Sequence, residues 1–486
     1  MIGSLPDELL VEIFDWCRLD DEYRWNHRRR WYNLLQVCRR WRHVMLEWAT
    51  HLKLRFLCSP ANPITTMPAH LTQIPLIIRF KFELHMPTLF REKLALALQN
   101  RDRVCEISIK TWGLDDLGLY KALGNAFPVL ETLSLDGVHT RQGLPFDFVA
   151  PHLRALHLRS IDRHVSMECF KLSLTNPMNL SSLRLDTFKA IPLKYLVESI
   201  ASMPHLENIS IEFQEPSPPD TVMELWSTQI TCVVLPRLSR LVFKGFGTYL
   251  ENLLTQINTP FLQDLRFTVI LMGIRSPSLV RLSGFLGTLQ NLKFQTAAIT
   301  FNRRFLIITY HSDQPSVGPQ YATFVIISSP NRHGDGAHSG VLLLQICNAV
   351  APALSVVESL ALKMNSADGD RSGFMLQPTF WHTFLRLFVG VKTLTIDVPL
   401  VVEISDALCP DNGAVITELL PVLSELVLVC LEDSVLFDQP FSSFVDARRL
   451  AGSPIDIRVV QHRPPSFHPP PISWSFDHFF TNNMIY

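Results

Sequence analysis

The chain has 486 residues, of which 47% are hydrophobic and 18% are charged. This composition allows large buried cores and argues against global disorder. Its 44 basic and 45 acidic side chains nearly cancel, so the net charge is not that of a general nucleic-acid-binding protein or a polybasic membrane protein.

The cysteines and histidines show no pattern of a disulfide framework or a metal site. Nine cysteines are spread from Cys17 to Cys430 without a CxxC pair, and the seventeen histidines never form HxxxH or HExxH. We therefore expect reduced, buried thiols in the cytoplasm or nucleus, and no metal or cofactor. The most apolar run, Gly340–Val357, contains polar residues and Pro352, so we expect no membrane partner.

The first fifty residues predict two short helices. The segment Leu5–Glu8 is typical of a helix start, because proline fits the first turn and acidic side chains favour the positive end of the helix dipole. The apolar residues that follow are spaced by three and four, which predicts one helical face made of Leu9, Leu10, Ile13 and Phe14. Beyond the polar stretch Asp20–Arg30, the same spacing predicts a second helix from Trp31 to Trp48.

Two helices of this size cannot enclose so many large apolar side chains by themselves. The apolar face therefore either packs on the part of the chain that follows or serves as an interface. Arginines interleave with tryptophans here, a pattern that superficially suggests nucleic-acid contacts. Acidic residues of the same segment offset these arginines, so we expect no nucleic-acid partner.

Two blocks of this segment, Leu5–Phe14 and Val37–Val44, resemble the F-box family. The family's usual run is Leu-Pro, an acidic residue and Leu-Leu-x-x-Ile-Phe, followed later by Val-Cys-basic-x-Trp-basic-x-Val. The resemblance implies docking onto the Skp-type adaptor of a cullin-RING ubiquitin ligase. The adaptor-binding residues that it implies are Leu5, Pro6, Leu9, Leu10, Ile13, Phe14, Val37, Cys38, Trp41 and Val44. The stretch Asp20–Arg30 is longer than the family's usual inter-helix turn, which leaves the local geometry open.

The rest of the chain contains a recurring L-x-x-L-x-L block. The blocks begin at Val104, Leu130, Leu153, Leu180, Leu206, Leu238, Leu262, Leu289, Val357, Val391 and Leu423. The first seven intervals run from 23 to 32 residues, which is about the period of leucine-rich repeats. Each block ends in a period-two alternation that is typical of a short strand. Helical patterns lie between blocks, at Leu114–Ala126, Leu193–Ser202, Thr221–Thr228 and Phe380–Phe388.

The alternation of strands and helices predicts an α/β fold with a parallel sheet and helices on its outer side. This part resembles the leucine-rich-repeat solenoids that commonly follow an F-box. Such repeats usually carry an asparagine or cysteine eight residues after the first leucine, and only Asn365 fits. We therefore expect an irregular solenoid.

Four segments follow from these patterns. Residues 1–58 are expected to form the helical F-box module, and residues 59–100 a linker with a first strand and helix. The solenoid is expected over residues 101–463, with a hairpin insertion at about 300–340. Residues 464–486 form a proline-rich tail.

Further elements are predicted outside the blocks. Strands are expected at Pro75–Leu84 and, as the arms of the hairpin, at Phe305–Tyr310 and Thr323–Ser328. Helices are expected at Arg91–Asn100 and, after a loop at Ser329–Gly340, at Gly340–Val350. A final helix and strand are expected at Pro440–Gly452 and Ile455–Val460.

Alternation along the strands sends every second residue of each block to the open face of the sheet. The charged residues at these positions include Asp136, His157, Arg159, Arg184, Asp186, Glu212, Arg240, Lys244, Asp264, Arg266 and Lys293. An ordinary solvated strand face has the same character. Basic residues are frequent in its middle, however, and a protein partner with an acidic segment is compatible with them. The candidate substrate-binding residues are Arg159, Arg184, Arg240, Lys244, Arg266 and Lys293.

The sequence contains no recognisable catalytic motif. The run Gly334–Gly340 nearly matches a dinucleotide-binding turn, but Ser339 replaces the third glycine and no first βαβ unit surrounds it, so we expect a flexible loop. A phosphate-binding loop and a nucleophile elbow are both missing. A Ser-His-Asp triad stays open, because its members meet only in three dimensions.

The two resemblances together imply a non-catalytic substrate-recognition subunit of a Skp-cullin-F-box type ubiquitin ligase. Such a subunit binds the adaptor through the F-box and an unknown protein substrate through the repeats. Two alternatives remain open. One is a leucine-rich-repeat scaffold that acts outside any ubiquitin ligase, and the other is an enzyme that its sequence does not reveal.

Overall fold

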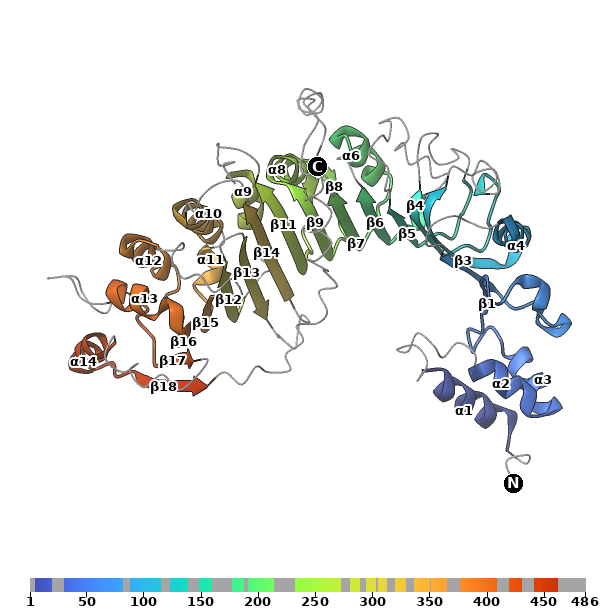
Figure 1. The fold of residues 1–486 in the computed structure, drawn as a ribbon, viewed down its shortest axis with the longest axis horizontal. Coiled ribbons are helices and arrows are strands. Elements are labelled where there is room, and N and C mark those ends of the chain that lie inside the picture. The colour runs from blue at the N-terminus through green and yellow to red at the C-terminus, as the bar shows by residue number, and fades with distance from the viewer. Residues whose placement is uncertain are drawn as a thin grey trace. The chain divides into compact units, whose positions relative to one another are not determined.

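The computed structural model describes residues 5–19, 30–81, 88–114, 123–138, 148–159, 177–187, 191–213, 232–271, 280–288, 294–302, 305–312, 320–328, 336–349, 351–364, 376–408, 419–430 and 441–461. They belong to two compact units, an N-terminal unit (Met1–Pro277) and a C-terminal unit (Ser278–Tyr486). Both units are built from strands and helices (Figure 1).

The chain begins with a module of three helices, α1 (Asp7–Leu19), α2 (Arg30–Val37) and α3 (Arg39–Glu47). Helix α1 starts where the sequence predicts, and the N–H of Leu10 donates to the carbonyl of Pro6 at 3.2 Å. The single second helix predicted from Trp31 to Trp48 is wrong, because it breaks at Cys38. Cys38 is extended, and its Sγ caps α3 by accepting the Trp41 N–H at 3.4 Å.

Nine described strands of the N-terminal unit pair in one parallel series. In spatial order they are β1 (Phe56–Cys58), β2 (Leu76–Lys81), β3 (Val104–Leu114), β4 (Thr132–Val138), β5 (Ala155–Arg159), β6 (Ser182–Thr187), β7 (Asn208–Phe213), β9 (Arg240–Phe246) and β11 (Asp264–Leu271). A separate parallel pair joins β8 (Val233–Val234) and β10 (Ile257–Asn258). The described helices that connect strands of this unit are α4 (Thr88–Leu98), α6 (Leu193–Ala201) and α8 (Gly247–Gln256).

The core of this unit lies between the strands and these helices. Helices α6 and α8 lie on the same side of the sheet (Figure 1). Alternate strand residues on that side are buried, as in Leu156 and Leu158 of β5. Parallel register aligns Leu156 with Leu133 of β4 and Leu183 of β6. Equivalent leucines of successive blocks therefore stack into a continuous core, which confirms the parallel sheet with helices.

Seven described strands of the C-terminal unit follow the order β14 (Gln320–Ser328), β13 (Phe305–Ser312), β12 (Thr296–Phe301), β15 (Ser359–Met364), β16 (Thr393–Asp397), β17 (Glu425–Cys430) and β18 (Asp456–Gln461). Strands β12, β15, β16, β17 and β18 pair in parallel, whereas β12, β13 and β14 pair in antiparallel fashion. The predicted hairpin is therefore confirmed, and it lies within the sheet. The helices of this unit are α9 (Val280–Thr288), α10 (Gly336–Ala349), α11 (Ala351–Leu354), α12 (Pro378–Leu385), α13 (Val401–Leu408) and α14 (Ser442–Leu450).

Most other predicted elements are present with shifted ends. Strand β2, helix α4, helix α6, helix α12, helix α14 and strand β18 match predicted segments. Strand β1 is new. The segment Thr221–Thr228, most of Leu114–Ala126 and Asn365 lie outside the described residues, although Leu114 itself ends β3. The limits of the four predicted segments stay a prediction.

Helix α10 begins at Gly336, so the loop predicted up to Gly340 is wrong from Gly336 onward. A glycine costs a helix about 1 kcal/mol relative to alanine, which is why the glycines there indicate a loop. Packing of α10 against α9 offsets that cost. Among the described helices, none is long and apolar enough to cross a membrane.

The block predicted at Leu289 is out of register. In the structure Ala297 of β12 pairs with Leu360 of β15. Buried Phe294 therefore takes the place of the block's first leucine, five residues after Leu289. The second apolar position of this block is Ala297, which does not match the L-x-x-L-x-L pattern. The pattern therefore places the start of the block at Leu289 instead of Phe294. Lys293, a candidate that depends on this block, lies outside the described residues.

Candidate functional site

The helical module has a small apolar core of its own. Leu10 and Phe14 of α1 and Val44 of α3 are almost fully buried. The ring of Phe14 meets the edge of the Trp41 ring, with their centroids 5.1 Å apart. These contacts hold α1 against α3 and explain how such short helices stay together.

A second set of apolar side chains on α1 faces solvent. Leu9 is 44% exposed, Ile13 42% and Trp16 75%. They are separated by four and three residues, so they form one line along the helix, which we call the α1 stripe. Val37, the last residue of α2, is also exposed. Contiguous exposed apolar side chains of this kind mark an interaction surface.

The ten candidate adaptor-binding residues thus occupy different places. Buried in the module are Leu10, Phe14 and Val44, and half-buried are Leu5 and Trp41. Exposed are Pro6, Leu9, Ile13, Val37 and Cys38. Trp16 extends the exposed line but lies beyond the motif that indicated the others. Its spacing of three residues from Ile13 is the signal that could have found it.

Two arginines of the block Val37–Val44 hold the helices of this module together. The guanidinium of Arg40 lies 2.6 Å from the carboxylate of Asp7 and also donates to the carbonyl of Leu5. Arg42 donates from Nε to the carbonyl of Leu35 at 3.0 Å. Arg40 therefore fastens the start of α1 to α3, and Arg42 joins α3 to α2.

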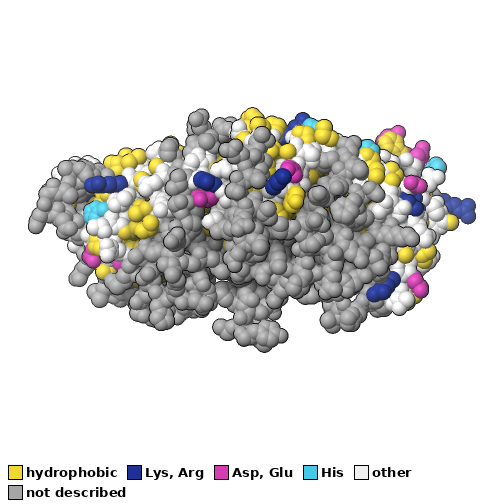
Figure 2. All heavy atoms as spheres, turned by 90° about the horizontal axis from the view of Figure 1, so that it is seen from above, with side chains coloured by type: hydrophobic (Ala, Val, Ile, Leu, Met, Phe, Trp, Pro, Cys, Tyr) yellow, Lys and Arg dark blue, Asp and Glu magenta, His cyan; other side chains and the backbone are white. Residues whose placement is uncertain are grey.

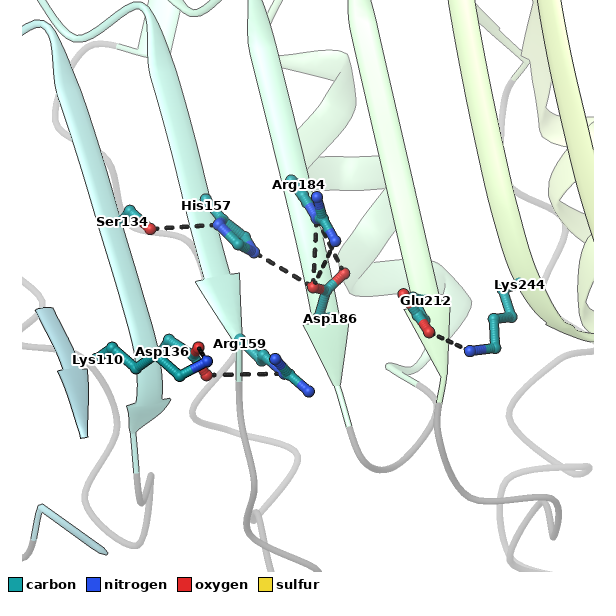
Figure 3. Close-up of polar contacts among 9 residues, drawn as sticks. All are labelled: Lys110, Ser134, Asp136, His157, Arg159, Arg184, Asp186, Glu212 and Lys244. Carbon is teal, nitrogen blue, oxygen red and sulfur yellow. Dashed lines mark hydrogen bonds and ion pairs between the residues drawn. The ribbon is translucent and has the colours of Figure 1, made fainter. Parts of the chain in front are cut away.

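The open face of the N-terminal unit carries cross-strand rows of charged side chains (Figure 3). Parallel register places one row on six neighbouring strands, namely Lys110, Asp136, Arg159, Asp186, Glu212 and Lys244. A second row includes Ser134, His157, Arg184 and Arg266. The structure thus brings the described members of the predicted open face together.

Acidic side chains of this face bridge basic ones on neighbouring strands. The carboxylate of Asp136 lies 3.1 Å from Lys110 and 3.7 Å from Arg159. Lys244 forms an ion pair with Glu212. Sequence reasoning gives the residues of the face but misses these pairs, because the pairs depend on strand register.

A similar bridge lies at the end of this surface. The carboxylate of Asp264 accepts Nε of Arg266 at 2.9 Å, and it lies 3.2 Å from Nε of Arg240. The five described candidate substrate-binding residues therefore all have acidic partners within the sheet. The role assigned to them stays a prediction.

Asp186 is the most enclosed of these carboxylates. Its side chain is only 5% exposed, and it lies 3.3 Å from Nε2 of His157 and 3.1 Å from Nη2 of Arg184. Burial opposes ionisation, but the hydrogen bond from His157 and the charge and hydrogen bond of Arg184 outweigh it and lower the pKa of Asp186. This carboxylate therefore stays ionised and holds both partners in place.

Ser134, His157 and Asp186 form a polar line, since Ser134 Oγ lies 3.2 Å from Nδ1 of His157. This is the composition of the triad that sequence reasoning leaves open. An acyl-transfer site also requires free backbone N–H groups beside the serine. Strand β4 pairs on both sides, with β3 and β5, so its backbone groups are committed to the sheet. The arrangement suits an ordered binding face better than catalysis.

Basic and acidic side chains are also visible in a second view of the described residues. In the view of Figure 2, basic and acidic side chains of the described residues lie beside one another among hydrophobic ones. Within the described residues, some basic side chains in the same view have no acidic side chain beside them.

A comparison with known families identifies the helical module. The family model described as F-box-like matches residues 2–47, the segment that contains α1, α2 and α3. Residues 2–47 are therefore an F-box-like domain, which confirms the resemblance of the N-terminal segment. No curated protein matches the chain. The leucine-rich-repeat character of the rest stays a prediction, with which the mostly parallel strands and their helices are consistent.

Proposed function

We propose that this chain, with its F-box-like domain at residues 2–47, is a substrate-recognition subunit of a Skp-cullin-F-box type ubiquitin ligase. F-box domains bind Skp-type adaptors of cullin ligases. The chain acts in the cytoplasm or nucleus and holds a protein substrate on the strands that follow. Its contribution is proximity, because bringing a substrate beside a ubiquitin-charged enzyme raises the effective concentration of the reacting groups.

The observation that carries this proposal is the α1 stripe within a matched F-box-like domain. Leu9, Ile13 and Trp16 are exposed although each is large and apolar. Burying them against an adaptor removes apolar surface from water, worth roughly 1.5–3 kcal/mol for a fully buried side chain. Trp16, the most exposed of them, has the size of a typical interface anchor.

The candidate residues divide accordingly into two roles. We assign adaptor contact to the exposed group, which contains Pro6, Leu9, Ile13, Trp16 and Val37. Support of the module falls to the buried and half-buried group, which contains Leu5, Leu10, Phe14, Trp41 and Val44. Cys38 acts mainly as the cap of α3, since its Sγ accepts the Trp41 N–H. A single motif therefore contains both an interface and the core that presents it.

Co-purification with the adaptor tests this role. The chain is co-expressed with a Skp-type adaptor, as wild type and as the Leu9→Asp/Ile13→Asp double variant. We expect wild type to bind, and the double variant to lose at least about 100-fold in affinity, because two apolar contacts are replaced by desolvated charges. Binding is measured by pull-down and by titration calorimetry.

Matched controls distinguish the loss of adaptor contact from a general effect of added charge and from misfolding. Leu89 of α4 and Val402 of α13 are exposed apolar helix residues outside the matched domain, so Leu89→Asp and Val402→Asp should leave adaptor binding unchanged. Circular dichroism checks that every variant is folded. The proposal fails if wild type binds no adaptor, or if the double variant binds as tightly as wild type.

A further inference from the structure

The open face of the N-terminal unit separates its charges by depth. In most ion pairs of this face the acidic partner is the less exposed one, as for Asp136, Asp186 and Asp264, whereas Glu212 is more exposed than Lys244. The guanidinium groups lie further out, and Arg184 is 52% exposed where Asp186 is 5% exposed. A molecule that approaches this face therefore meets basic groups first.

The partly buried carboxylate of Asp264 also orients two arginines. Asp264 engages Nε of both Arg240 and Arg266. Within the described residues, the terminal Nη atoms of these two arginines make no hydrogen bond. A guanidinium has five N–H donors in a rigid fork. An arginine held at Nε can thus offer its remaining donors to a carboxylate while the internal pair stays intact.

The face retains a positive excess. From β2 to β11 its rows contain more basic than acidic side chains. The eight basic ones are Arg79, Lys81, Lys110, Arg159, Arg184, Arg240, Lys244 and Arg266, and the five acidic ones are Glu106, Asp136, Asp186, Glu212 and Asp264. The formal charge of these rows is therefore about +3 with His157 counted as neutral, in a chain whose net charge is −1. This local excess favours an anionic partner.

The arginines extend across five neighbouring strands, from β5 to β11. Adjacent strands lie about 4.8 Å apart, so the four steps cover about 19 Å. An extended chain advances about 3.3 Å per residue, and a segment of about six residues spans this distance. Its side chains on one side would recur about every 7 Å, which suits alternating acidic residues.

From depth, orientation, excess charge and spacing, we infer that this face binds an extended acidic segment of about six residues through its carboxylates. Arg159, Arg184, Arg240 and Arg266 supply the outward donors. That the segment belongs to a ubiquitination substrate rests on the proposed function. Binding of the segment itself does not.

Fluorescence anisotropy of labelled peptides tests the inference. The probes are a Ser-Glu repeat of eight residues, its Ser-Gln counterpart and a single-stranded oligonucleotide of eight bases, each titrated with the full chain in complex with the adaptor. We expect the Ser-Glu peptide to bind and the Ser-Gln peptide not to bind. Each outward arginine should contribute about tenfold, so Arg184→Gln/Arg240→Gln should weaken binding about 100-fold.

A matched control comes from the C-terminal unit. Arg458 of β18 pairs with Asp456 and Glu425 in the same manner and is more exposed. Arg458→Gln should leave Ser-Glu binding unchanged. An equal loss in Arg458→Gln, binding of Ser-Gln as tight as Ser-Glu, or preference for the oligonucleotide would each overturn the inference.

The adaptor-binding variant separates this inference from the proposed function. Leu9→Asp/Ile13→Asp, tested without adaptor, should bind the Ser-Glu peptide as well as wild type does, because α1 is not part of the open face. If the chain binds no adaptor but still binds the peptide, the ligase role fails and the acidic-segment site stands. If adaptor binding is intact and no peptide binds, the site fails alone.

Discussion

Asp186 shows how much one side chain contributes to the open face. Its carboxylate accepts hydrogen bonds from His157 on one neighbouring strand and from Arg184 on its own strand. The side chain is nearly enclosed. Replacing the carboxylate with an amide keeps one acceptor oxygen but puts an NH2 donor in place of the other, so the two charge-assisted hydrogen bonds are weakened or lost. The cost of such a loss exceeds that of an exposed ion pair, which is usually below about 1 kcal/mol.

Replacing Asp186 with asparagine should therefore destabilise the protein. We expect Asp186→Asn to lower the free energy of unfolding at pH 7 by about 1–3 kcal/mol. Because the pKa of Asp186 is lowered in the folded state, its ionised form favours folding. That contribution is complete above the unfolded pKa of about 4 and is lost as pH falls through the lower folded pKa.

Urea unfolding of wild type and Asp186→Asn between pH 7 and pH 3 measures this difference. The gap between the two proteins should narrow at the acid end. Asp456→Asn in β18 is the control, since Asp456 is largely exposed, and it should change stability by less than about 0.5 kcal/mol. A gap that is the same at all pH values contradicts the assigned role of the charge.

At the scale of elements, the regular parts of the fold were predictable and the exceptions were not. Period-two alternation locates the strands, and their parallel pairing follows from the helices between them. The break at Cys38 depends on a thiol cap, and thiols are not the usual capping groups. The register of β12 depends on Ala297, whose small side chain does not stand out in a leucine pattern.

The candidate surfaces show the same division. The F-box motif selects residues of the N-terminal module, but it cannot separate buried Phe14 from exposed Leu9, since both are apolar at helical spacing. Alternation selects the open-face residues. It cannot pair Asp264 with Arg240, because that contact requires the register between strands whose blocks are 24 residues apart.

Glu403 joins two helices of the C-terminal unit. Its carboxylate, on α13, accepts the indole N–H of Trp381 on α12 at 3.3 Å and the N–H of Leu376 at 3.4 Å. Burial raises the pKa of Glu403, and these two hydrogen bonds offset only part of that effect. Folding therefore favours the protonated form of Glu403 over the ionised one. In both forms the carboxyl oxygens are needed to accept the hydrogen bonds from Trp381 and Leu376.

Glu403→Gln should keep the acceptor and remove the charge. We expect it to match wild type or to exceed it by less than about 1 kcal/mol at pH 7, since the group is partly exposed. The folded pKa is raised, so the stability that protonated Glu403 gives is complete below its unfolded pKa and is lost as pH rises through the folded value. The stability of wild type relative to Glu403→Gln should therefore increase as pH falls.

Thermal unfolding of wild type and Glu403→Gln from pH 7 to pH 4 follows this change. Glu403→Leu is the companion variant, because it removes the acceptor and should destabilise by about 1–3 kcal/mol at both ends of the range. A clear loss of stability for Glu403→Gln at pH 7 would show that the charge itself supports the helix pair.

At the scale of the whole molecule, the proposed function requires the α1 stripe and the open face on one chain. Neither surface alone brings a substrate to the ligase, since proximity arises only when both partners are held together. A reporter protein that carries the Ser-Glu segment and accessible lysines should therefore be ubiquitinated by the reconstituted ligase with the wild-type chain.

Two variants then test whether the surfaces must be linked. Leu9→Asp/Ile13→Asp removes adaptor contact, and Arg184→Gln/Arg240→Gln removes outward donors, so each should reduce reporter ubiquitination more than about tenfold. An equimolar mixture of the two variants should not restore it, because the substrate-bound chain then lacks adaptor and the adaptor-bound chain lacks substrate. Quantitative immunoblotting of the conjugates measures the rate. Full activity of the mixture would show that the two surfaces can act from different chains. That result would contradict the requirement that one chain carry both surfaces.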